Sequence, residues 1–114
     1  MLSLVWPETL KDEVIQAQKP VLFALLNKDE SYQDQIKALE KVIHLFNKHI
    51  KVCLGIEEFL ESFFEHFGIN GAPLYFLFYD GKEVQRFFGH AKTKDLIGIA
   101  EVGVRLSKNK KTQL

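Results

Sequence analysis

The clearest structural signal in the chain lies at residues 74–81, which read Leu74-Tyr75-Phe76-Leu77-Phe78-Tyr79-Asp80-Gly81. The apolar run has the length of a β-strand, and an Asp-Gly pair directly after a strand is a strong signal for a tight hairpin turn. We therefore expect Glu83–Phe88 to return antiparallel to this strand. A second uninterrupted apolar run, Val21–Leu26, is also of strand length. Strands that are apolar along their whole length are typical of a sheet covered on both faces.

Helices are expected between and around these strands. After Ser31, apolar residues recur every three or four positions, as in a helix with one buried face. They are Tyr32, Ile36, Leu39, Ile43, Phe46 and Ile50. Shorter helices are expected at residues 9–17 and 57–67, and a last amphipathic helix should begin with Thr93 as its cap. Residues 50–56 should form one more strand.

Strands that alternate with helices and end in a hairpin predict an α/β fold, a sandwich in which helices flank a central mixed sheet. A chain of 114 residues has room for one domain. We expect this single domain at residues 1–107, followed by a polar, lysine-bearing C-terminal tail at residues 108–114.

The composition argues against several classes of function. Fifteen basic residues balance fifteen acidic ones, so no long-range field should attract nucleic acid or an anionic membrane. Only Arg86 and Arg105 are arginines, whereas surfaces that recognise phosphates favour guanidinium groups. Cys53 is the only cysteine, so no intramolecular disulfide and no multi-cysteine zinc site can form. Because no signal peptide and no apolar run of membrane-spanning length are present, we expect a cytoplasmic protein.

Four short segments carry a resemblance to a known family. They are Lys19-Pro20-Val21-Leu22, Gly71-Ala72-Pro73, Asp80-Gly81-Lys82 and Gly89. Together with the order of the expected elements, they resemble thioredoxin over nearly the whole chain, from about Trp6 to Leu106. The resemblance implies a thioredoxin-like three-layer sandwich. It also implies a cis peptide bond between Ala72 and Pro73, which in that family faces the redox site.

The chain departs from the thioredoxin pattern at the redox motif. The Cys-x-x-Cys of the family falls on Glu30-Ser31-Tyr32-Gln33, and its buried acid falls on Ala24. Dithiol–disulfide exchange needs one thiolate to attack and a second thiol to resolve the mixed disulfide. We therefore expect no such activity, no catalytic residue, and no cofactor or metal site. Ser31 is expected to be the N-cap of the following helix rather than a nucleophile.

A groove beside Pro73 should persist without the thiols, because backbone and turn geometry build it. Its expected lining is Tyr32, Ala72, Pro73, Gly89 and His90. The resemblance implies that an extended peptide or another protein binds there by strand addition. Tyr32 would contribute an apolar ring and one hydroxyl to such an anchor, and the simpler alternative is that its ring only packs on the helix stripe. This interpretation makes the chain a redox-inactive thioredoxin-like domain that serves as a binding or scaffold module.

Two other functions stay open at this point. One is a one-cysteine enzyme of the thioredoxin superfamily, or a redox component that receives its second thiol in trans, with Cys53 as its thiol. The apolar neighbours of Cys53 in an expected strand instead favour a buried, inert thiol. The other is a structural domain that dimerises through an exposed Phe-rich surface.

Overall fold

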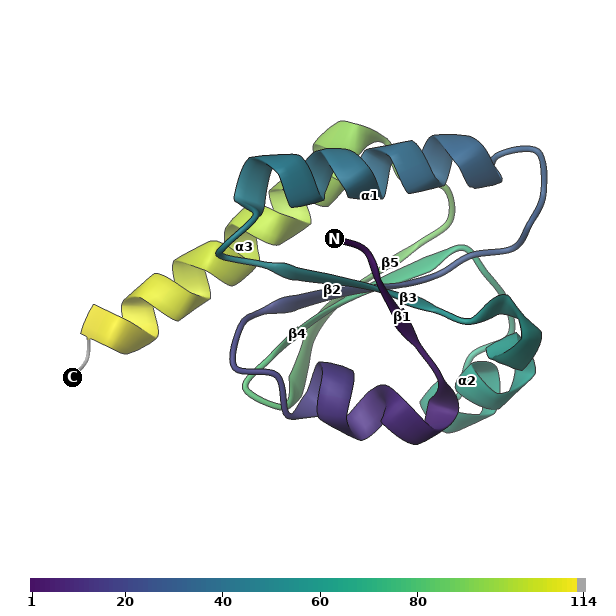
Figure 1. Ribbon diagram of the computed structural model, residues 1–114, viewed down its shortest axis with the longest axis horizontal. Helices are drawn as coiled ribbons and strands as arrows, with labels where there is room; N and C mark the ends of the chain where they lie inside the picture. Colours follow the sequence, from purple (N-terminus) through teal and green to yellow (C-terminus); the bar gives the residue numbers. More distant parts are fainter. Residues whose placement is uncertain (113–114) are drawn as a thin grey trace.

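A computed structural model of the chain describes residues 1–112 and contains one five-stranded sheet with helices on both sides (Figure 1). The strands are β1 (Ser3–Val5), β2 (Val21–Leu25), β3 (Lys51–Gly55), β4 (Leu74–Tyr79) and β5 (Lys82–Phe88). Their order across the sheet is β1-β3-β2-β4-β5. β1, β3 and β2 are mutually parallel, β4 is antiparallel to β2, and β5 is antiparallel to β4. The expected α/β fold with a mixed sheet is confirmed.

Three helices and three short helical turns cover the sheet. The helices are α1 (Tyr32–Phe46), α2 (Leu60–Phe67) and α3 (Thr93–Thr112), and the turns are η1 (Pro7–Thr9), η2 (Lys11–Ile15) and η3 (Glu57–Phe59). α1 and α3 pack on one face of the sheet, whereas η2 and α2 pack on the other (Figure 1). The arrangement therefore has three layers.

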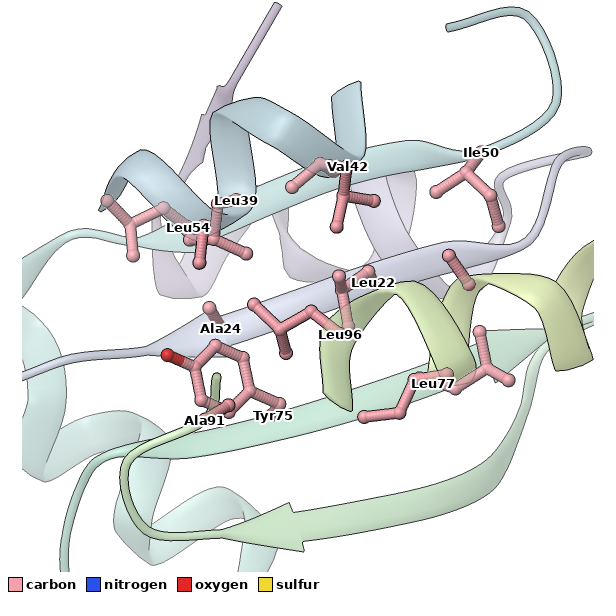
Figure 2. Packing of buried hydrophobic residues seen from close by; sticks show 14 of the residues in the cluster. Leu22, Ala24, Leu39, Val42, Ile50, Leu54, Tyr75, Leu77, Ala91 and Leu96 are labelled. Carbon is pink, nitrogen blue, oxygen red and sulfur yellow. The ribbon is translucent and has the colours of Figure 1, made fainter. Parts of the chain in front are cut away.

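The central strand β2 shows how the apolar runs specify these layers. Leu22 and Ala24 belong to the hydrophobic cluster under α1 and α3, and Phe23 belongs to the cluster under α2. Figure 2 shows the first cluster, to which α1 contributes Leu39 and α3 contributes Leu96. The side chains of these residues of β2, α1 and α3 are all completely buried. A strand that contributes to two cores needs apolar residues at every position, which is the pattern seen in the sequence.

The predicted hairpin between β4 and β5 is confirmed. Asp80 and Gly81 both have positive φ, 56° and 78°, which is the backbone of the tight turn that Asp-Gly pairs favour. The pairing shifts between Leu77 and Phe78 of β4, so that Val84 of β5 has no direct partner. Such a bulge disrupts the outer edge of β5 and makes it a poor template for another strand.

The N-terminal region differs from its sequence prediction. β1 was not expected, because it has only three residues and its Leu4 is exposed. The helix expected at residues 9–17 is instead a 3-10 turn followed by one π-helical turn. Short elements of this kind carry too few residues for a periodic pattern to identify them.

Two helix ends also differ from expectation. α1 ends at Phe46, and Ile50, which continued its apolar spacing, lies buried just before β3. α3 continues to Thr112, so residues 108–112 are helical rather than a tail, and residues 113–114 lie outside the described part of the chain. In this extension Lys110 forms an ion pair with Asp80 at 3.0 Å and lies over the ring of Tyr79.

Candidate functional site

Several chain segments meet at the edge of the sheet where the parallel strands end. Because β4 is antiparallel to β2, its first residue, Leu74, pairs with Leu25 at the end of β2, and Phe88 at the end of β5 pairs with Leu74. Three loops therefore meet at this edge, namely residues 26–31, 68–73 and 89–92. In α/β folds this edge is the usual place for ligands.

Two hydrogen bonds tie these loops together beside Pro73. The side-chain amide of Asn27 donates to the carbonyl of Ala72 at 2.9 Å. The backbone N–H of Gly89 donates to the carbonyl of Pro73, also at 2.9 Å. The Ala72–Pro73 bond is cis, as the resemblance to thioredoxin implies. Three predicted site residues, Ala72, Pro73 and Gly89, are thus neighbours.

A cleft of about 460 Å³ lies on this edge. Loop residues 68–73 and Gly89 form part of its lining, and Arg86 and Phe88 of β5 form the rest. Phe88 is 65% exposed although its side chain is a large apolar ring. An apolar ring left in water beside a cleft is a feature of binding surfaces more than of a packed core.

Arg86 is fixed in the lining of this cleft. Its guanidinium forms two hydrogen bonds with the carboxylate of Glu83, at 2.5 and 3.0 Å, and these raise the pKa of Arg86. It also donates to the carbonyl of Phe67 at 3.3 Å and lies over the ring of Phe76. The arginine therefore joins β5 to the end of α2 at this part of the cleft.

Tyr32, which the sequence placed in the same groove, lies elsewhere. It lines a smaller pocket of about 170 Å³, with Leu26, Leu54 and Glu57 among its neighbours. Its ring packs against the hydrophobic cluster under α1 and α3. The structure therefore gives Tyr32 the packing role that was its simpler alternative, and Phe88 takes its place beside Pro73.

Residues 30–33, which the resemblance aligns with the redox motif of thioredoxin, lie at the start of α1. Both the hydroxyl and the backbone N–H of Ser31 donate to the carboxylate of Asp29, at 2.6 and 2.9 Å. These bonds lower the pKa of Asp29, and His90, 3.9 Å away, lowers it further. Ser31 is the N-cap residue of α1, as expected, but its hydroxyl makes no cap hydrogen bond. Glu30, like Gln33, is exposed to solvent.

Cys53 lies in the middle of the sheet rather than at this edge. It pairs with Ser3 of β1 and Phe23 of β2, and its side chain is 0% exposed in the cluster under α2. Burial raises the pKa of the thiol to about 12. Since the thiolate is the reactive form, this position makes the cysteine inert.

We expect native Cys53 to react with a thiol reagent at least about a hundredfold more slowly than the same residue in the unfolded chain. The physical reason is that labelling requires both exposure of β3 and ionisation of a desolvated thiol. Time courses of labelling, with and without concentrated guanidinium chloride, measure this ratio. A native rate close to the unfolded rate would instead favour a one-cysteine chemistry.

A buried polar network holds the loop that carries His90, and sequence analysis missed it. Gln35 of α1 is the only buried polar residue among the described side chains. Its amide donates to the carbonyl of Ala91 at 3.1 Å, and its oxygen accepts from the N–H of Ala91 at 3.1 Å and from the hydroxyl of Tyr75. Burial raises the pKa of Tyr75, which keeps this hydroxyl a donor. The network therefore fixes residues 89–92 to α1.

Comparisons with known proteins do not assign the chain. No protein-family model matches it, and no curated protein matches it either. Within residues 1–112, no helix has both the length and the apolar character needed to cross a membrane. The same described part of the chain contains no group of three or more His, Cys, Asp or Glu side chains arranged to hold a metal ion.

Proposed function

We propose that this chain is a redox-inactive domain of thioredoxin-like architecture that binds an extended segment of a partner protein beside Pro73. The observation that carries the proposal is the 460 Å³ cleft at the meeting point of the loops, with exposed Phe88 in its lining. Binding needs no thiol there, because the cleft is built from loop backbone and from β5.

The chemistry of the site supports a binding role over a redox role. Residues 30–33 supply no thiol, and Ala24 occupies the position of the buried acid in the thioredoxin family. Cys53 is fully buried in β3, away from the loops. A dithiol mechanism needs two accessible thiols. The loops beside Pro73 therefore offer groups that can bind a ligand but no thiol for disulfide exchange.

The composition of the cleft favours an extended peptide as the ligand. Gly68, Gly71 and Gly89 are in the lining, and a glycine leaves the neighbouring backbone N–H and C=O groups uncovered. Extended peptides bind through backbone hydrogen bonds, with an apolar side chain in an adjacent pocket for specificity. Phe88 would contact such an apolar side chain.

Peptides selected on the immobilised protein from a random library should bind at least about tenfold more weakly after Phe88→Ser, because the aromatic contact is lost. Val84→Ser is the matched control, since Val84 is an exposed apolar residue of the same strand that does not line the cleft. Affinities measured by fluorescence anisotropy compare the variants.

Equal binding of selected peptides by the Phe88 variant and the native chain would overturn this proposal. If no peptide is selected, and the native chain elutes as a dimer that Phe88→Ser dissociates, the surface serves self-association instead. An assay of disulfide reduction with a model protein gives an independent readout, and we expect no rate above that of the reductant alone.

A further inference from the structure

A second cleft lies at the opposite edge of the sheet, where β2 and β3 begin. Its volume is about 340 Å³. Pro20 and Val104 contribute its apolar part. The polar lining consists of Gln18, Lys19, Lys48, His49, Ser107 and Lys108.

Tertiary structure brings these residues together from three distant segments. The carbonyl of Pro20 accepts a hydrogen bond from the N–H of Lys51 at 2.9 Å, which places the start of β2 beside the start of β3. A Cβ at Gly103 of α3 would lie only 3.0 Å from side-chain atoms of Pro20 and Ile50, so this helix passes close above both strands. Figure 1 shows α3 passing this edge before it extends beyond the sheet. Lys19, Lys48 and Lys108 therefore surround one cleft.

Among residues 1–112, the lining is rich in hydrogen-bond donors and contains no carboxylate. Two other lysines near this end of the sheet are paired: Lys51 contacts Glu13 at 3.2 Å, and Lys110 contacts Asp80 at 3.0 Å. Among residues 1–112, by contrast, no ion pair involves Lys19 or Lys48. Lys19 and Lys48 therefore place two positive charges beside this cleft without an ion-pair partner among the described residues, and such charges favour a bound anion.

We propose that this cleft binds the phosphate groups of a compact polyanion, such as a polyphosphate or the phosphate chain of a nucleotide. Lysine ammonium groups bind phosphate as point charges and do not need the planar fork of arginine. The balanced net charge of the chain does not oppose such a site, because only the nearby charges act strongly through water and salt. A neighbouring cleft of about 440 Å³ shares Gln18 and Lys19, and it provides room for the rest of a larger ligand.

The test is a calorimetric titration with tripolyphosphate at constant ionic strength. We expect Lys19→Ala with Lys48→Ala to weaken binding at least about tenfold, since two charge-assisted contacts are lost. The matched control is Lys37→Ala with Lys41→Ala, which removes the same charge from two exposed lysines of α1 outside the cleft. We expect the control to bind within about twofold of the native chain.

The double variant at positions 19 and 48 replaces exposed residues of loops, so loss of binding can be separated from loss of folding by circular dichroism. A titration with a nucleoside triphosphate distinguishes the two sources of the phosphate chain. Equal affinity assigns the site to phosphate alone, and tighter binding assigns it to a nucleotide. Absence of tripolyphosphate binding, or equal weakening in both double variants, would show that the cleft has no specific anion site.

Discussion

Replacing Gln35 by Leu should lower the free energy of unfolding by about 3–5 kcal/mol, because it leaves three buried polar groups without partners at about 1–3 kcal/mol each. These groups are the hydroxyl of Tyr75 and both backbone groups of Ala91. A small domain has only about 5–15 kcal/mol of stability in total. The variant should therefore lose a large share of its stability, as measured by urea denaturation.

A second substitution identifies the cause of this loss. Tyr75→Phe in the native chain removes one hydrogen bond and should cost about 1 kcal/mol. In the Gln35→Leu background the same change removes an orphan hydroxyl, so we expect it to be neutral or stabilising. Gln33→Leu, an exposed position on the same helix, should stay within about 0.5 kcal/mol of the native chain. Equal losses from Gln33→Leu and Gln35→Leu would contradict the network.

The sequence contained enough information to predict four of the five strands, β2 to β5, and the three α-helices. The apolar runs at residues 21–26 and 74–79 were read as strands because burial on both faces requires an apolar residue at every position. The Asp80-Gly81 turn was recognisable because its positive φ angles suit very few residue pairs. These features are local, and a local pattern is sufficient to identify them.

The parts that escaped prediction depend on contacts between distant residues. Gln35 lies in a stretch of polar residues that is typical of a solvent-exposed helix surface. Its hydrogen-bond partner Ala91 is 56 positions away in the sequence. The lysines of the second cleft are spread over residues 19–108, so no window of sequence shows them as a cluster. Tyr32 was assigned to the groove because the resemblance aligns it with a redox-motif position at the helix start, but it lines another pocket. Pairings of this kind follow only from the tertiary fold.

Gly103→Leu should lower the free energy of unfolding by about 3 kcal/mol, because α3 has no space for a side chain where it crosses the sheet. An added Cβ would lie 3.0 Å from Ile50, 3.0 Å from Pro20 and 3.1 Å from Leu77. Ile50 and Leu77 are buried, so neither can move into solvent. The remaining atoms of Leu can be accommodated only if α3 moves away from the sheet.

The matched control for this prediction lies on the same helix. A Cβ at Gly98 would have no heavy atom within 4 Å apart from its chain neighbours and the backbone of its own helix, and replacing glycine in a helix by leucine favours the helix by about 0.5–1 kcal/mol. Gly98→Leu should therefore keep or increase the stability in urea denaturation, opposite in sign to Gly103→Leu. Because α3 also forms one wall of the lysine-lined cleft, Gly103→Leu should weaken tripolyphosphate binding as well, whereas Gly98→Leu should not. If both variants were as stable as the native chain, α3 could not pack on Pro20 and Ile50 as closely as described, and the cleft between them would lose its structural basis.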